Sequence, residues 1–365
     1  MKKNGKIEFY RFVFCISVLL FHAEKYILGE AKLDVFRMAF FPHGSIGVEF
    51  FFLVSGFFLG KHAYKKYSEY HESDKLTHDI LFRDSAGYLI GRIKRIFPTH
   101  VVAYLIALFA YIISVSMSMN KTLWYILDNV PSFFLVQMSG LKITSANHVE
   151  WFLSAMLIAT AVIYPICRKW YSGFTSYIAP IGALLILGYL FRETGTLTGV
   201  FEEVGFMYKA TLRAIAEMAL GTTAFEITRR LSDSKTHKKS FRLQITLLEI
   251  ISFALVILFV ICTLPKKYEF YALALLFVLL VCAGSGAGYG SRFFDSKFFY
   301  ALGSMTLPIY LCQIPAVYMV QGFLSKRDTN AQIWFMILIT LVFAITVKVI
   351  GLIARMILNV DEPER

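Results

Sequence analysis

Long apolar runs recur along the chain and are separated by short polar segments. Each run has close to the ~20 residues that a helix needs to cross ~30 Å of hydrocarbon at 1.5 Å per residue. We therefore predict an all-α, polytopic integral membrane protein with about ten transmembrane helices, forming a single transmembrane domain over residues 1–365. The predicted spans are 7–28, 45–61, 97–117, 150–167, 176–191, 206–228, 242–263, 269–287, 298–323 and 333–358.

The segment 124–139 is also apolar, but it contains Asp128, Asn129 and Pro131. These residues interrupt an apolar helix, so we predict a re-entrant or interfacial segment here rather than a span. An eleventh span through this segment is the alternative, and it would invert the orientation of every later helix.

Composition agrees with a membrane protein. Hydrophobic residues make up 57% of the 365 residues and charged residues 17%, whereas soluble domains have about 45–50% and about 25%. This excludes a soluble enzyme, a disordered chain and a fibrous protein. The five cysteines all lie in apolar runs without metal-ligand spacing, so we expect reduced, buried thiols and no metal site.

The net charge of +12 lies between the apolar runs, where it predicts orientation rather than nucleic-acid binding. With the N-terminus inside, 23 basic residues fall on the inner side and nine on the outer side. Because inner loops of membrane proteins are enriched in Lys and Arg, we predict a multi-pass protein of the cell membrane with both termini cytoplasmic. Residues 62–96 are predicted to form a cytoplasmic loop.

A few charged or titratable residues lie inside the predicted spans, where each costs at least ~2.5–3.5 kcal/mol on insertion scales. Arg11 and His22 are eleven residues apart, which places them on one stripe of a helix, about 16.5 Å apart along its axis. Together they suggest a polar path through the membrane. Snorkelling of Arg11 to lipid phosphates and a satisfied core histidine are the alternatives. The other such residues are Glu49, Arg213, Glu217, Glu249 and Lys348.

Two of these positions suggest partners. Glu49 lies about one turn into the second predicted span, at a depth that roughly matches that of His22, so its carboxylate is predicted to orient the imidazole. A glutamate that faces interfacial water is the alternative. Arg213 and Glu217 are spaced i,i+4 and can pair on one helix face, and this pair has a purely structural alternative. Glu249 and Lys348 have no role that the sequence assigns.

A basic segment precedes the third predicted span. Arg92 and Arg95 are i,i+3 neighbours, suited to fork-like contact with phosphate. Pro98 fits the first turn of a membrane helix. A generic positively charged flank of a span is the alternative.

These features resemble the membrane-bound acyltransferase family 3, and the resemblance extends over most of the chain. Its specific parts are the Arg–His spacing of Arg11 and His22 and a phrase at the start of the second helix. The matching segments are Gly47–Phe57, Arg92–Pro98, Trp151–Leu153, Tyr164–Pro165 and Leu302–Leu311. The chain departs from the family pattern at Met156, where many members have Glu, and at Gln313, near which many have His. It resembles a stand-alone membrane domain of the family.

The resemblance implies transfer of an acyl group, often acetyl, from cytoplasmic acyl-CoA to a hydroxyl of a cell-surface glycan or its lipid-linked precursor. It therefore implies acyl-CoA as donor, a carbohydrate acceptor and membrane lipid as partners, with no metal and no nucleic acid. His22 is the predicted general base, with Glu49 to orient it. Arg92 and Arg95 would hold CoA phosphates, and Arg11 would line the donor tunnel. Trp151 and Arg213 are predicted to contact the acceptor.

Three alternatives remain open from the sequence. His22 can act as a nucleophile and form an acyl-His intermediate instead of acting as a base. A transporter or flippase of a lipid-linked sugar would also bury charges along a route through the membrane. A membrane scaffold or sensor would tolerate replacement of His22.

Overall fold

The computed structural model describes residues 4–28, 41–70, 76–141, 143, 145–233 and 238–357, and these are almost entirely helical. The main helices are α1 (Gly5–Ala23), α2 (Gly47–Tyr70), α3 (His78–Ser114), α4 (Met119–Phe133), α5 (Trp151–Lys169), α7 (Ala179–Thr194), α8 (Lys209–Asp233), α9 (Lys239–Ile261), α10 (Glu269–Ser285), α12 (Lys297–Phe323) and α13 (Thr329–Ile357). Shorter elements are η1 (Glu24–Leu28), η2 (Gly44–Ile46), η3 (His148–Glu150), α6 (Tyr171–Gly173), η4 (Phe174–Ile178), η5 (Lys266–Tyr268) and α11 (Ser291–Phe294). Strands β1 (Glu203–Val204) and β2 (Met207–Tyr208) form an antiparallel pair.

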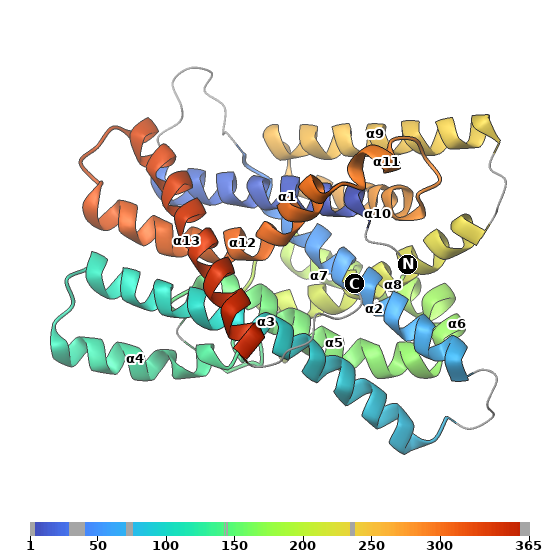
Figure 1. Ribbon diagram of the computed structural model, residues 1–365, viewed down its shortest axis with the longest axis horizontal. Helices are drawn as coiled ribbons and strands as arrows, with labels where there is room; N and C mark the ends of the chain where they lie inside the picture. Colours follow the sequence, from blue (N-terminus) through green and yellow to red (C-terminus); the bar gives the residue numbers. More distant parts are fainter. Residues whose placement is uncertain are drawn as a thin grey trace.

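The helices form one bundle in which α12 and α8 each pack against several others. Helix α12 contacts α1, α3 and α13, and α8 contacts α2, α5, α7 and α10. Figure 1 shows α12 between α1 and α3, and α8 close to α2. Residues from the two ends of the sequence therefore meet near the centre of the molecule.

All ten predicted spans coincide with described helices, although residue 358 lies outside the described residues. Eight helices of the described chain are long and apolar enough to cross a membrane, which confirms a polytopic all-α membrane protein. Helices α1 and α8 are not among these eight. Both helices carry several charged residues, and those buried inside the bundle include Lys6 in α1 and Arg213 and Glu217 in α8.

The predicted loop over 62–96 is largely helical. Helix α2 continues to Tyr70, and α3 already begins at His78, where the Thr77 hydroxyl accepts a hydrogen bond from the Ile80 amide. Such a cap satisfies an otherwise unpaired amide and starts the helix early. Residues 71–75 of the predicted loop lie outside the described residues.

Helices α4 and α5 lie one after the other along α3. The Tyr104 hydroxyl of α3 donates to the Asn129 carbonyl of α4, and Arg168 of α5 contacts Asp84 of α3 with Nε 3.1 Å from Oδ2. Helix α4 therefore packs beside the C-terminal half of α3 and α5 beside its N-terminal half. The segment predicted as re-entrant or interfacial, 124–139, comprises residues 124–133 of α4 and the turn after it.

Close approach of α2 and α8 depends on glycine. A Cβ on Gly56 would overlap the Met218 backbone, and a Cβ on Gly221 would overlap the Leu53 carbonyl. Small residues at such crossings let helix backbones pack directly in membranes. The Gly47–Phe57 phrase thus places α2 against α8, and Glu49 of α2 and Glu217 of α8 are both buried there.

We expect Gly56→Val to destabilise the protein strongly, because the branched side chain must push α2 from α8. Overpacking of a tight core costs typically ~1–3 kcal/mol, occasionally more. The midpoint of thermal unfolding in detergent measures this. Gly87→Val is the matched control, since a Cβ on Gly87 of α3 meets nothing within 4 Å. Equal midpoints for the two variants would contradict the close crossing.

Candidate active site

His22 lies near the end of α1 and is held by α12. Its Nδ1 atom is 2.6 Å from Oε1 of Gln313, whose side chain is fully buried. The Tyr26 ring of η1 lies 5.8 Å from the imidazole between centroids. With Oε1 as acceptor, Nδ1 carries the hydrogen and Nε2 keeps its lone pair. This is the form in which His22 can take a proton from a hydroxyl.

Pro315 in α12 removes a backbone hydrogen bond of the helix next to Gln313. Pro315 has no N–H, so the Leu311 carbonyl loses its normal partner four residues later. The Asn147 side chain supplies that partner, donating from Nδ2 to the Leu311 oxygen over 2.9 Å. The segment before α5 is thereby tied to the turn of α12 that presents Gln313.

A second buried histidine joins this segment to α3. His100 Nδ1 lies 3.2 Å from Oε1 of Glu150, and its Nε2 lies 3.0 Å from the Phe133 carbonyl oxygen. Asn147 Nδ2 also contacts Glu150 Oε1 at 3.3 Å. His100, Glu150 and Asn147 are all fully buried. A carbonyl accepts but cannot donate, so the hydrogen of the contact with Phe133 is carried by Nε2 of His100. The His100–Glu150 pair joins the end of α4 and the start of α5 to α3.

The structure corrects the expectation that Glu49 orients His22. The imidazole of His22 contacts Gln313, whereas Glu49 pairs with Arg213. The reason is the position along α1 at which α2 begins. The Phe50 ring lies 4.8 Å from that of Phe14 in α1, and His22 is eight residues, about 12 Å, further along α1. Depth counted from the ends of the predicted spans therefore did not predict which residues of α1 and α2 are neighbours.

Glu49, Arg213 and Glu217 form a buried charge triad between α2 and α8. Arg213 Nη1 lies 3.5 Å from Glu49 Oε1, and its Nε lies 3.5 Å from Glu217 Oε1. Arg213 Nη1 also donates to the Leu197 carbonyl over 2.7 Å. All three charged side chains are at most 3% exposed, so two carboxylates share one guanidinium away from bulk water.

Trp151 connects the triad to the other cluster. The centroid of its ring lies 5.4 Å from Arg213 Cζ. Trp151 directly follows Glu150 in the chain. The neighbouring Phe152 ring packs 5.7 Å from Tyr310 of α12, and Tyr310 precedes Gln313 by three residues. Trp151 and Arg213, the predicted acceptor contacts, are therefore brought together. On α12, about one turn separates Tyr310 from Gln313, which contacts His22.

Arg11 is held by a neighbour on its own helix. Its Nη1 atom lies 2.7 Å from Glu8 Oε2. The Glu8 side chain packs against Gly303 of α12, where a Cβ would overlap the carboxylate. The Gly-Ser phrase of α12 thus makes room for the Glu8–Arg11 pair. The two residues left unassigned by the sequence have structural partners, since Lys6 pairs with Glu249 at 2.6 Å and Lys348 donates to Ser304 at 2.8 Å.

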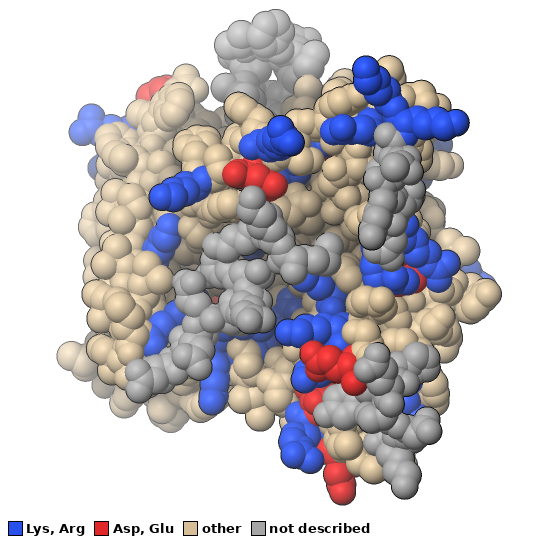
Figure 2. All heavy atoms as spheres, turned by 45° about the vertical axis from the view of Figure 1, so that its right-hand side comes forward, with Lys and Arg blue, Asp and Glu red and all other residues tan. Residues whose placement is uncertain are grey.

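Arg92 has uncharged partners. Its Nη1 contacts the Tyr88 hydroxyl at 3.3 Å, and its Nη2 contacts the Met156 sulfur at 2.9 Å. Met156 is the position at which Glu is found in many members of the resembling family, so here no carboxylate at that position neutralises the guanidinium. Arg95, one turn later on α3, donates from Nε to the Gly91 carbonyl. Lys and Arg side chains predominate over Asp and Glu on the face of the molecule in Figure 2.

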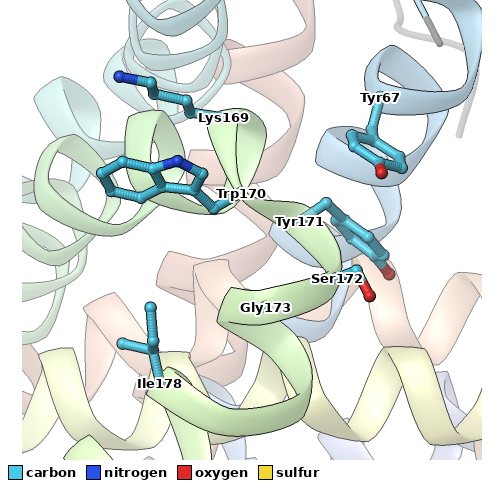
Figure 3. A pocket seen from close by; sticks show the side chains of 7 residues that line it. All are labelled: Tyr67, Lys169, Trp170, Tyr171, Ser172, Gly173 and Ile178. Carbon is cyan, nitrogen blue, oxygen red and sulfur yellow. The ribbon is translucent and has the colours of Figure 1, made fainter.

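A depression of about 490 Å³ lies apart from these clusters, near the ends of α2 and α5. Figure 3 shows its aromatic side chains and Lys169 around a turn of the chain. None of the predicted site residues lines it. Its lining residues are Tyr67, Lys169, Trp170, Tyr171, Ser172, Gly173 and Ile178.

The sequence alone missed four residues of the site. They are His100, Asn147, Glu150 and Gln313. Glu150 and His100 stand at the ends of predicted spans, where polar residues are ordinarily solvated. The signal that points to Asn147 and Gln313 is Pro315, because a proline inside an apolar helix frees a carbonyl that a buried polar group must satisfy.

Comparison with known proteins gives one family. Residues 4–352 match a family model described as an acyltransferase domain. No curated protein and no solved structure matches the chain. Among the described residues, no group of three or more His, Cys, Asp or Glu side chains is arranged to hold a metal ion.

Proposed function

This chain belongs to the acyltransferase family whose model covers residues 4–352. We propose that it transfers an acyl group, with acetyl as the proposed group, from acyl-CoA to a hydroxyl of a cell-surface glycan or its lipid-linked precursor. The family and the apolar helices make it a membrane-embedded O-acyltransferase. The donor, the acceptor and the roles of single residues are the proposal.

The observation that carries the proposal is the His22–Gln313 hydrogen bond. It leaves Nε2 of the imidazole to accept the proton of the acceptor hydroxyl. The hydroxyl oxygen then attacks the thioester carbonyl carbon, and the carbon–sulfur bond breaks. The imidazolium returns the proton to the CoA thiolate, so the transfer is balanced without an added reagent.

The donor enters beside Arg92 and Arg95 of α3. CoA carries several negative charges. Arg92 is half-buried and has no carboxylate partner among the described residues, so its guanidinium favours phosphate. Arg95 stands one turn further on the same helix. Arg11 lies on the His22 stripe of α1, and the ~16 Å between them is comparable with an extended pantetheine arm. The thioester thereby reaches His22 while the nucleotide stays at the surface.

The acceptor approaches Trp151 and Arg213 from the opposite side. An aromatic ring beside a guanidinium is suited to the apolar face and hydroxyls of a sugar. Glu49 acts through Arg213, whose guanidinium it helps to hold. In this orientation both termini are cytoplasmic and the enzyme lies in the cell membrane, as the distribution of basic residues predicts.

We expect Arg92→Ala to weaken acyl-CoA binding by roughly 10- to 150-fold. A charge-assisted hydrogen bond contributes ~1.5–3 kcal/mol, and ~1.4 kcal/mol is tenfold in affinity. Arg95→Ala should behave alike, and Lys at either position should restore binding in part. Equilibrium binding of acyl-CoA to the purified variants measures this.

Arg83→Ala is the matched control for the donor site. Arg83 is an exposed arginine of the same helix, so its removal should leave the dissociation constant unchanged. If Arg92→Ala and Arg95→Ala both bind acyl-CoA as the wild type does, these residues are positively charged flanks and the donor site lies elsewhere.

A single-turnover experiment separates the two routes for His22. Purified protein is mixed with labelled acyl-CoA without acceptor, and the protein is then isolated. A general base leaves the protein unlabelled, and an acyl-His intermediate labels wild type but not His22→Ala.

A further inference from the structure

The contact between His22 and Gln313 decides which nitrogen of the imidazole is available. We propose that Gln313 is a positioning residue for acyl transfer, because its amide oxygen holds His22 in the Nδ1–H tautomer and leaves Nε2 as the base. This inference rests on the proposed role of His22. It assigns a function to a residue at which the chain departs from the family pattern.

The burial of Gln313 makes the contact specific. Its side chain is fully buried, its Oε1 lies 2.6 Å from His22 Nδ1, and its Nε2 has no hydrogen-bond partner among the described residues. The reverse amide orientation would place a donor on Nδ1 and leave Nε2 of the imidazole protonated. Such a histidine cannot act as a base through Nε2. The orientation with Oε1 towards His22 is the one that supports the reaction.

The backbone of α12 holds Gln313 in place. Residues 309–314 lie between Pro308 and Pro315, and Asn147 binds the Leu311 carbonyl that Pro315 leaves unpaired. Gln321, two turns later, donates to the Tyr26 carbonyl of η1. Helix α12 is therefore fastened to the segment before α5 and to η1, which directly follows α1 and His22 in the chain. These contacts hold Gln313 in a fixed place relative to the imidazole.

Charged and titratable neighbours of His22 come from two further elements. Lys25 of η1 and His148 of η3 lie close enough to interact electrostatically with the imidazole. Both disfavour an added positive charge, and Gln313 adds none. A carboxylate in place of the Gln313 amide would stabilise the imidazolium against these neighbours.

Two substitutions separate the amide oxygen from the amide nitrogen. Gln313→Glu keeps an acceptor for Nδ1 and loses the N–H donors, whereas Gln313→Leu loses both. We expect Gln313→Leu to lower kcat by about 10- to 100-fold, in the range that misplacement of a catalytic group costs, with little change in donor KM. Gln313→Glu should keep most of the kcat at high pH. Its rate should fall to half its maximum at a pH at least about one unit higher than in wild type, because the carboxylate keeps the imidazole protonated.

The tautomer of His22 can be read without an activity assay. The ring nitrogens are labelled with ¹⁵N, and the His22 signals are identified by their loss in His22→Ala. We expect Nδ1–H in wild type and a shift towards Nε2–H in Gln313→Leu. Gln332→Leu is the matched control, because Gln332 is a half-buried glutamine at the start of α13 whose side-chain amide bonds only the Ser325 and Arg327 carbonyls among the described residues. It should leave both tautomer and kcat unchanged.

Each outcome decides the assignment. A wild-type tautomer in Gln313→Leu, or a loss of kcat in Gln313→Glu as large as that in Gln313→Leu without a shift of the pH profile, overturns it. If wild type shows Nδ1–H and Gln313→Leu does not, but His22→Ala still transfers acyl groups, Gln313 positions His22 and it is the proposed role of His22 that fails.

Discussion

Replacing His22 with alanine is expected to abolish acyl transfer while the protein remains folded. A positioned general base contributes about 10²- to 10⁴-fold to the rate, and His22 is the histidine whose Nδ1 is fixed by a buried amide. Initial rates with saturating acyl-CoA measure the loss, and thermal unfolding in detergent confirms the fold. The affinity for acyl-CoA should change little, because the proposed nucleotide site is at Arg92 and Arg95.

His78→Ala is the matched control for that experiment. His78 is an exposed histidine at the start of α3, so its removal should leave the rate unchanged. A His22→Ala protein that turns over at nearly the wild-type rate would remove His22 from the mechanism and favour a scaffold or sensor.

The second large effect concerns the charge triad. Arg213→Met keeps much of the side-chain volume but leaves the Glu49 and Glu217 carboxylates buried without their shared cation. Breaking a buried ion pair in this way costs about 3–5 kcal/mol. We expect the free energy of unfolding to fall by this order, seen as a lower unfolding midpoint or as failure to accumulate in the membrane.

A triple variant then separates structure from binding. This variant combines Glu49→Gln, Arg213→Met and Glu217→Gln, so all three charges are removed together. Such replacements of a whole buried ion cluster are often neutral for stability. Recovered stability with lost acceptor use would support the proposed contact between Arg213 and the acceptor. Recovered stability with wild-type transfer would mean that the triad is structural. If Arg213→Met alone is as stable as wild type, the ion pairs do not hold α2 to α8.

Hydrophobic runs predicted the helices well because lipid requires about 20 apolar residues per crossing. The same rule could not find how far α2 and α3 continue beyond the apolar part, since Tyr70 and His78 lie in polar sequence that is helical through capping and packing. It also could not predict that α4 and α5 pack one after the other along α3. That arrangement depends on His100 and Glu150, whose pairing is visible only once the helices are packed.

Geometry within one helix was predictable from the sequence. Helical spacing pairs Arg213 with Glu217, and the structure has this ion pair. Arg11 and His22 both lie on α1, as predicted. Contacts between helices were not predictable from residue spacing. Glu49 was matched to His22 by depth, but the relative level of α1 and α2 is set by Gly44 and Gly47, which let η2 and the start of α2 pack against the Ser17 and Phe14 backbone.

Transfer from labelled acetyl-CoA in membrane vesicles tests the central proposal most directly. Inverted vesicles from cells that express wild type or His22→Ala receive labelled acetyl-CoA on their exposed cytoplasmic face, and alkali-labile label is then measured in the glycan and lipid-linked fractions. We expect label in these fractions with wild type and background label with His22→Ala. Background label with wild type, or equal label with both proteins, would contradict acyl transfer from acetyl-CoA through His22.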